Sequence, residues 1–283
     1  SEYADIAERM SHEDRTLCIV NTRKDAKEIF TQLPKEGLTL HLSRMMCPAH
    51  VAKTIATIKQ ALKDDSQQVI RVVATQLIEA GVDIDFPSVF RQKAGLDSIL
   101  QAAGRCNREG RMSKHGITHV FDIKGCKGYG SMKDARNAFD NVITDDLQSQ
   151  EAMTDYFNQL YSRSETDKAG ICEELYGSSG IRYKDAANKF KLIDDDGQAI
   201  IVDYGDASQL IQELKKYGPN YSLMRRLRQY MVTVRQQDFN ALYSVGSIEE
   251  IVEGVFHLTH CEQYKEDIGL ITDNTWLEEI YIK

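Results

Sequence analysis

The chain has 283 residues, 42% of them hydrophobic and 28% charged, which is enough for two globular domains and includes no apolar run long enough to cross a membrane. The N-terminal segment lacks the basic and apolar pattern of a secretory signal, so we expect a cytoplasmic protein with no membrane partner. The net charge of −8 does not exclude nucleic acid, because residues 1–124 hold 18 Lys/Arg against 16 Asp/Glu, whereas residues 125–283 hold 17 against 27.

The first 125 residues alternate short β-branched runs with helical patterns, which is typical of a parallel sheet covered by helices. Helices are predicted from about Arg23 to Leu33 and from about Pro48 to Leu62. Strands are predicted at residues 16–20, 38–42, 69–74, 87–90 and 119–123. We therefore predict an α/β domain over residues 1–125.

The rest of the chain has a different pattern. From Ser131 the apolar residues follow helical spacing, which predicts a helical linker over residues 126–180. A smaller α+β accessory domain is predicted over residues 181–283. Its elements are expected to be a hairpin of residues 190–193 and 199–202 around an Asp-Asp-Asp-Gly turn, helices at 212–217 and 223–230, and a strand at 231–234.

Two linked runs carry the strongest functional signal. Residues 72–85 form a strand-like run that ends in the hydroxyl of Thr75 and leads to a glycine and two carboxylates. Residues 101–108 read Gln-Ala-Ala-Gly-Arg-Cys-Asn-Arg. On a helix, Arg105 and Arg108 would share one face and could form a fork toward a polyphosphate.

Phosphoryl transfer needs fixed positive charge around the transferred group, and an arginine on a rigid element supplies it. Gly81 would allow close backbone approach, and Asp83 could accept a hydrogen bond from a ribose hydroxyl. The alternative is a solvated helix face formed by Arg105, Arg108 and Arg111, with an ordinary turn at 81–83. Because the two runs lie some twenty residues apart and each follows a strand signal, the functional interpretation is favoured.

Together the runs resemble motifs V and VI of superfamily 2 helicases, and residues 18–22 stand where motif IV belongs. Residues 42–50, which contain Met-Cys-Pro-Ala-His, and residues 96–108 are similar to a narrower family, the CRISPR-associated helicase-nucleases of type I systems. That family is recruited by the Cascade surveillance complex to unwind and degrade invading DNA. The resemblance is dense over residues 16–123 and thin afterwards.

The resemblance implies a RecA-like parallel sheet with flanking helices, here the second RecA-like domain. It implies catalytic roles for Arg105 and Arg108. The implied nucleotide-binding residues are Gly81, Asp83, Gln101 and Gly104. The residues implied to contact the backbone of single-stranded DNA are Asn21, Thr22, Ser43 and Thr75.

Two departures limit these expectations. Arg44 stands where the family has threonine and Met45 where it has arginine, so we assign no nucleic-acid contact to Arg44. The 283 residues also contain no G-x-x-x-x-G-K-[ST] run, no D-E-x-H box and no paired His-Asp nuclease element. In this family ATP and Mg²⁺ are held mainly by the first RecA-like domain. We therefore expect the fragment alone to hold neither and to be inactive, and we expect the missing motor and nuclease domains to act with it in cis or in trans.

Metal sites are not expected. The six cysteines include no C-x-x-C pair, and residues 257–261 (His-Leu-Thr-His-Cys) lack a fourth ligand at useful spacing. One basic cluster occurs in the acidic half, and it would be a solvated helix face or a contact with nucleic acid or the helicase core. Its members are Arg225, Arg226, Arg228 and Arg235.

Two alternative functions stay open. Another superfamily 2 helicase, acting in DNA repair or on RNA, would share motifs V and VI. A non-catalytic module could retain the motor fold for docking to a partner protein. The Met-Cys-Pro-Ala-His and Ala-Gly-Arg-Cys-Asn-Arg runs favour the CRISPR family over both alternatives.

Overall fold

The structure is a computed structural model, and it describes residues 1–64, 68–79, 81–110, 115–126, 128, 130–163, 165–178, 180–190 and 197–272. The chain forms two compact units. The first comprises residues 1–93, 98–126 and 197–283, and the second comprises residues 94–97 and 127–196. The accessory segment from residue 197 onward therefore belongs to the same unit as the N-terminal sheet. The predicted domain boundaries at 125 and 180 stay predictions.

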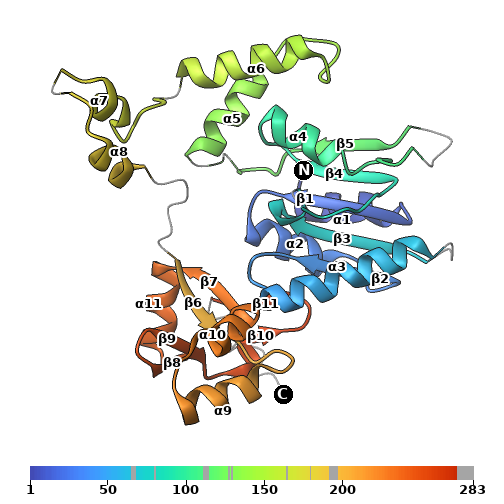
Figure 1. The fold of residues 1–283 in the computed structure, drawn as a ribbon. Coiled ribbons are helices and arrows are strands. Elements are labelled where there is room, and N and C mark those ends of the chain that lie inside the picture. The colour runs from blue at the N-terminus through green and yellow to red at the C-terminus, as the bar shows by residue number, and fades with distance from the viewer. Residues whose placement is uncertain are drawn as a thin grey trace. The chain divides into compact units, whose positions relative to one another are not determined.

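A five-stranded sheet organises the N-terminal part of the first unit, in the order β2-β3-β1-β4-β5 (Figure 1). Its strands are β1 (Arg15–Val20), β2 (Leu38–Leu42), β3 (Ile70–Thr75), β4 (Ser88–Gln92) and β5 (Ile117–Phe121). Each neighbouring pair is parallel. Strands β3 and β4 are buried along their whole length, as expected where helices cover both faces of a sheet. The predicted α/β class is confirmed.

Successive side chains of a strand point to opposite sides, so the strands place buried apolar residues on both faces of the sheet, and helices cover both faces. On β1, Leu17 and Ile19 join one buried cluster, and Cys18 and Val20 join the other. The flanking helices are α1 (Tyr3–Ser11), α2 (Arg23–Gln32), α3 (Pro48–Lys63) and α4 (Leu96–Ala103), with a short 3₁₀ turn, η1 (Gln76–Ile78), after β3. Helix α1 was not predicted.

A second, four-stranded sheet lies in the C-terminal part of the same unit, in the order β7-β6-β9-β8. Its strands are β6 (Gly197–Ile201), β7 (Met231–Arg235), β8 (Ile248–Val252) and β9 (Val255–Leu258). The helices around it are α9 (Ala207–Tyr217), α10 (Tyr221–Leu227) and α11 (Gln236–Ser244), with a 3₁₀ turn η2 (Arg228–Tyr230) after α10. A smaller ribbon follows, with η3 (Cys261–Gln263), β10 (Tyr264–Lys265) and β11 (Gly269–Leu270).

The second arm of the predicted hairpin, residues 199–202, overlaps β6, whose partners among the described residues come from later in the chain. Strand β6 pairs antiparallel with β7, from Gly197 opposite Arg235 to Ile201 opposite Met231, and parallel with β9. Residues 191–196, which include most of the expected first arm and the turn, lie outside the described residues. The local turn pattern gave no information about β7, because that partner lies some thirty residues later.

The second unit is helical in its described residues, with α5 (Ser131–Asp140), α6 (Gln150–Arg163), α7 (Ile171–Tyr176) and α8 (Tyr183–Lys189). The hydroxyl of Tyr156 donates to Asp97 at 2.8 Å, which joins α6 to the first turn of α4. Glu174 on α7 is buried between Arg182 at 2.8 Å and Lys189 at 2.5 Å. None of the helices within the described ranges is long and apolar enough to cross a membrane.

Candidate functional site

The two predicted motif runs interlock through the loop that leads from β3 to β4. After β3 and η1, the chain turns through Gly81, whose φ of 73° is the left-handed conformation that glycine adopts most readily. The guanidinium of Arg105 donates to the carbonyl of Val82 at 2.5 Å and to the carbonyl of Glu79 at 2.6 Å. Partial burial, and then the nearby charge of Arg108, lower the pKa of Arg105. Arg105 therefore anchors the loop that follows β3.

Arg108 has a different environment. Its guanidinium forms an ion pair with Asp83 at 2.7 Å, and its side chain is 47% exposed while that of Asp83 is 69% exposed. Its backbone N–H donates to Asp85 at 2.8 Å. An exposed ion pair in water contributes little to stability, so a phosphate could take the guanidinium from Asp83 at small cost.

The predicted helical placement of the two arginines is wrong. Helix α4 ends at Ala103, and both arginines lie in the turns after it. The N–H of Phe86 donates to the carbonyl of Arg105, and the N–H of Asn107 donates back to Phe86, so this segment runs beside the strand entry instead of continuing the helix. Asn107 has a φ of 46°, which also breaks helical geometry.

Of the predicted nucleotide-binding residues, Gly81 and Asp83 lie beside the arginines. Gln101 is exposed on the last turn of α4, and Gly104 is exposed directly after it. The nucleotide roles of all four stay predictions.

A basic pocket of about 460 Å³ lies near the ends of β1 and β3. The carboxyl ends of parallel strands are the usual ligand edge of such sheets. The pocket is lined by Asn21, Arg23, Arg44, Thr75, Gln76, Leu77, Thr233 and Arg235, without a carboxylate among these residues. We call it the basic pocket.

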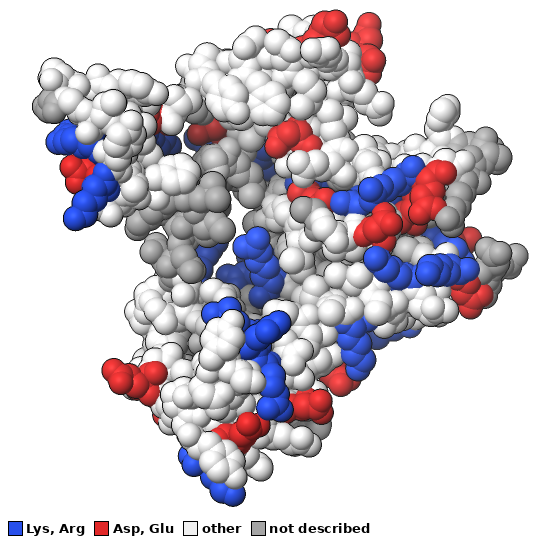
Figure 2. All heavy atoms as spheres, viewed as in Figure 1, with Lys and Arg blue, Asp and Glu red and all other residues white. Residues whose placement is uncertain are grey.

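The three arginines of the basic pocket differ in their partners. Arg23 pairs with Asp238 at 3.3 Å and also contacts the sulfur of Met45. Arg44 and Arg235 are exposed, and within the described part of the chain neither makes a side-chain hydrogen bond or ion pair. Figure 2 shows basic side chains gathered over the part of the molecule that holds β7 and α10, with few acidic side chains among them. Two guanidiniums are thus available to a phosphate backbone.

The residues predicted to contact nucleic acid divide into two pairs. Asn21 and Thr75 line the basic pocket, although both are mostly buried. The hydroxyl of Thr22 instead accepts from the N–H of Asp25 at 3.0 Å and caps α2. Ser43 is 1% exposed, and its hydroxyl accepts from the N–H of Met45 at 3.2 Å. The hydroxyls of Thr22 and Ser43 therefore stabilise their own backbone turns.

Sequence reasoning missed Arg23 and Thr233 as pocket residues, and it assigned no nucleic-acid contact to Arg44, which also lines the pocket. Arg235 belonged to the recognised basic cluster, but its neighbour Arg226 pairs with Glu213 on α9 at 3.1 Å. No local pattern separates these two arginines, because only the pairing of β7 beside β6 carries Arg235 to the pocket.

The turn that carries Arg44 is fastened to the C-terminal ribbon. The N–H of Leu270 donates to the carbonyl of Met45 at 2.8 Å. A Cβ at Gly269, which has a φ of 80°, would lie 2.3 Å from that carbonyl oxygen, so the contact requires glycine. Met45 and Cys47 belong to the buried cluster of the C-terminal sheet. The Met-Cys-Pro-Ala-His run is therefore the joint between the two sheets.

No metal centre is found: the part of the chain that the structure describes has no group of three or more His, Cys, Asp or Glu side chains able to hold an ion. His257 lies 3.0 Å from Asp203 and 3.6 Å from Glu249.

The parallel sheet, its flanking helices and the appended mixed sheet define a RecA-like α/β fold with an α+β accessory part. Residues 12–111 match the family model described as CRISPR-associated nuclease/helicase Cas3, C-terminal. The CRISPR-associated nuclease/helicase Cas3 of Haloferax volcanii is 56% identical over 45 residues, which are 16% of this chain and 5% of that protein. The resemblance predicted from the motifs is thus confirmed, and the chain is similar to the C-terminal part of Cas3.

Solved structures agree in fold. The crystal structure of T. fusca Cas3 with AMPPNP matches 95% of this chain and 40% of its own, with a TM-score of 0.58 at 14% identity. A crystal structure of a CRISPR-associated protein matches 95% of this chain and 39% of its own, with a TM-score of 0.60 at 11% identity. The chain thus spans about two fifths of the length of these structures.

Proposed function

We propose that this chain is the second motor domain and C-terminal part of an ATP-dependent translocase or helicase that acts on single-stranded DNA in CRISPR interference. One observation carries the proposal. The segments that resemble motifs IV, V and VI belong to one linked structure: motif IV and the start of motif V line the basic pocket at the carboxyl ends of β1 and β3, and the loop that leads on from β3 carries Asp83 to the exposed Arg108. That arrangement suits a protein that couples phosphate chemistry to a nucleic-acid backbone.

The nucleotide part of the proposal assigns different roles to the two arginines. Arg108, being exposed, would stabilise negative charge that develops on the transferred phosphoryl group. Arg105 would hold the loop of Gly81 and Asp83, where Asp83 could accept from a ribose hydroxyl. Gln101 and Gly104 would border the nucleotide. ATP with Mg²⁺ would be bound mainly by a first RecA-like domain.

The nucleic-acid part of the proposal places the DNA backbone in the basic pocket. Arg44 and Arg235 would bind phosphates, and the hydroxyls of Thr75 and Thr233 could donate to phosphate oxygens without reading sequence. Such binding would be tolerant of sequence and sensitive to salt. Asn21, Thr22 and Ser43 would shape the loops that surround the DNA.

The partners follow from the similarity to Cas3. The chain would work with a first RecA-like domain and a nuclease domain, in cis or in trans. The Cascade surveillance complex would recruit the assembled protein so that target DNA is unwound for degradation.

The test compares the isolated chain with a protein that also contains the first RecA-like domain. We expect no ATP turnover by the isolated chain, and turnover stimulated by single-stranded DNA in the larger protein. Fluorescence anisotropy should show weak binding of the isolated chain to an oligo-dT strand, weaker still in high salt. Turnover that follows the purified chain through several columns would contradict the proposed division of roles. Tight, salt-insensitive binding to one duplex sequence would contradict the proposed ligand, and tight protein binding without DNA binding would favour a docking module.

A further inference from the structure

A charged side chain that has no role in the proposed chemistry lies between the candidate sites. Arg91 on β4 is 0% exposed. Burying a guanidinium is costly unless it is paired and hydrogen-bonded, so its partners indicate what it stabilises.

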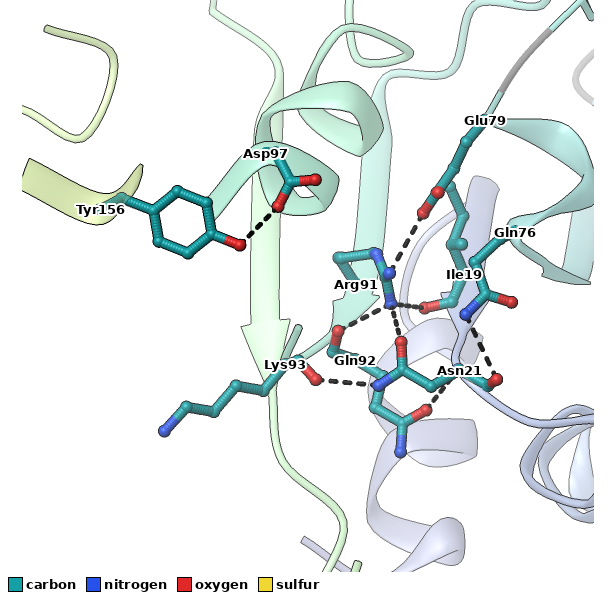
Figure 3. A network of polar contacts seen from close by, with 9 residues as sticks. All are labelled: Ile19, Asn21, Gln76, Glu79, Arg91, Gln92, Lys93, Asp97 and Tyr156. Carbon is teal, nitrogen blue, oxygen red and sulfur yellow. Dashed lines mark hydrogen bonds and ion pairs between the residues drawn. The ribbon is translucent and has the colours of Figure 1, made fainter. Parts of the chain in front are cut away.

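The partners of Arg91 come from separate strands. One guanidinium nitrogen donates to the side-chain oxygen of Asn21 at 2.8 Å and to the carbonyl of Gln92 at 2.8 Å. The other forms an ion pair with Glu79 at 3.1 Å. Figure 3 shows the guanidinium between Asn21, which follows β1, and Glu79, which follows η1. Arg91 therefore joins the loop after β1 to the loop after β3.

Each of these partners continues toward one of the candidate sites. Asn21 lines the basic pocket, and its carbonyl accepts from the side chain of Gln76, another lining residue, at 3.2 Å (Figure 3). The carbonyl of Glu79 accepts from Arg105 at 2.6 Å. An unbroken series of contacts thus runs from the pocket wall through Arg91 to the turn that carries Arg105 and Arg108.

We propose that Arg91 is a positioning residue that couples occupancy of the basic pocket to the ordering of the turn at residues 104–110. The inference rests on the proposed function, because it needs a nucleic-acid backbone in the pocket. A strand that orders Asn21 and Gln76 would restrict Arg91, and charge-assisted hydrogen bonds would restrict Glu79 and Arg105 in turn. Coupling of this kind is reciprocal, so a nucleotide at the turn would favour DNA in the pocket.

Backbone amides in the turn provide a direct readout. The N–H groups of residues 105–108 and 110 all donate to described acceptors, so their hydrogen exchange reports opening of this turn. Exchange would be measured by mass spectrometry on the isolated chain, with and without saturating oligo-dT. In the wild-type chain we expect DNA to slow exchange of peptides that cover residues 104–110 by about tenfold, the size of a typical coupling between sites.

Two variants remove the connection in different ways. The double variant Arg91→Met with Glu79→Gln removes both buried charges, so that neither is left unpaired. Arg91→Lys keeps a charge near Glu79 but loses the planar guanidinium that contacts Glu79 and Asn21 at the same time. This variant replaces the double variant in the experiment if the double variant does not fold. Both should still bind oligo-dT at saturating concentration, and both should lose the DNA-dependent slowing.

The matched control is Arg71→Met. Arg71 lies on β3, is 5% exposed, and donates to the carbonyls of Glu36 and Ser11 at 3.2 and 3.0 Å, away from the pocket and the turn. If Arg91 merely supported the fold, substitutions at Arg71 and Arg91 would have similar effects on the DNA-dependent slowing of exchange. We expect Arg71→Met to lower stability yet keep the DNA-dependent slowing.

The outcomes separate the inference from the proposed function. If the wild-type chain does not bind oligo-dT, the proposed function fails, and the coupling fails with it. If DNA binds and the Arg91 variants retain the slowing, or Arg71→Met loses it equally, the role of Arg91 is overturned while the proposed function stands.

Discussion

The hydroxyl of Tyr264 accepts a hydrogen bond from the backbone N–H of Cys47 at 3.0 Å, across 217 positions of sequence. The same hydroxyl lies 2.9 Å from Nδ1 of His50, whose ring stacks on Tyr204 at 4.5 Å between centroids. These contacts bind the C-terminal ribbon to the first turn of α3. They position the turn of Arg44, and hence one wall of the basic pocket, from both sheets at once.

Removing the Tyr264 hydroxyl should weaken this joint. Tyr264→Phe keeps the ring but leaves the buried N–H of Cys47 without its acceptor, which should cost about 1–3 kcal/mol. Urea unfolding would measure the loss. Tyr243→Phe is the control, because that ring is exposed and should change stability by no more than about 0.5 kcal/mol. Equal stability of the two variants would show that the Tyr264 hydroxyl contributes nothing to the joint.

Arg44 and Arg235 should each account for one phosphate contact. The logarithm of the single-strand binding constant falls with the logarithm of salt concentration by about 0.7 per contact, so each Arg→Gln variant should reduce that slope by about 0.7. Arg226→Gln is the matched control, since Arg226 pairs with Glu213 and does not line the pocket. An unchanged slope in both pocket variants would place the DNA elsewhere.

Substitutions of the two motif arginines should have different effects on turnover and stability in a protein that contains both RecA-like domains. Arg108→Ala should lower ATP turnover by about 10³- to 10⁵-fold, the usual effect of losing an arginine finger, with stability changed by no more than about 0.5 kcal/mol. Arg105→Ala should lower turnover and also destabilise the domain by about 2 kcal/mol, because two carbonyls lose a charged donor.

Turnover and thermal midpoint should be measured on the same preparations. Arg108→Lys keeps the charge and loses the planar fork, so full activity in this variant would count against a geometric role. Normal turnover in Arg108→Ala would reject the finger and return Arg108 to a solvated surface role.

Stability should fall in mild acid because of His41. This ring is buried, its Nδ1 has no hydrogen-bond partner among the described residues, and burial lowers the pKa of His41 to about 4. The unfolded chain, with an ordinary pKa near 6.5, then binds a proton that the folded chain does not bind. The free energy of unfolding is therefore unaffected by His41 above about pH 6.5. Between pH 6.5 and pH 4 it falls by about 3 kcal/mol as the unfolded chain takes up the proton.

Unfolding free energies between pH 7 and pH 4 would test this expectation. His41→Phe should flatten the pH dependence by roughly that amount, whereas His12→Gln, which changes an exposed ring, should follow the wild-type curve. Parallel curves for His41→Phe and the wild type would contradict it.

Local sequence patterns were sufficient to predict the parallel α/β class of the N-terminal sheet and the strands that build it. The apolar run at residues 72–74 places apolar side chains on both faces of its strand, which is typical of a strand covered on both sides, and the residues of motif V follow this strand directly. Local order therefore predicted that Thr75, Gly81 and Asp83 come after one buried strand. The Met-Cys-Pro-Ala-His run lies within the residues that match the Cas3 C-terminal family model, although its structural role was not evident from sequence.

Tertiary structure decided how the functional side chains are used. Helix α4 ends at Ala103, and the segment that follows, in which Cys106 pairs beside Phe86, leaves Arg105 partly buried and Arg108 exposed. Arg235 reaches the basic pocket because β7 pairs with β6, a contact between segments about thirty residues apart. Periodicity and motif spacing describe only neighbours along the chain. The partners that set burial, pairing and charge at this site come from distant segments, and only the folded chain brings them together.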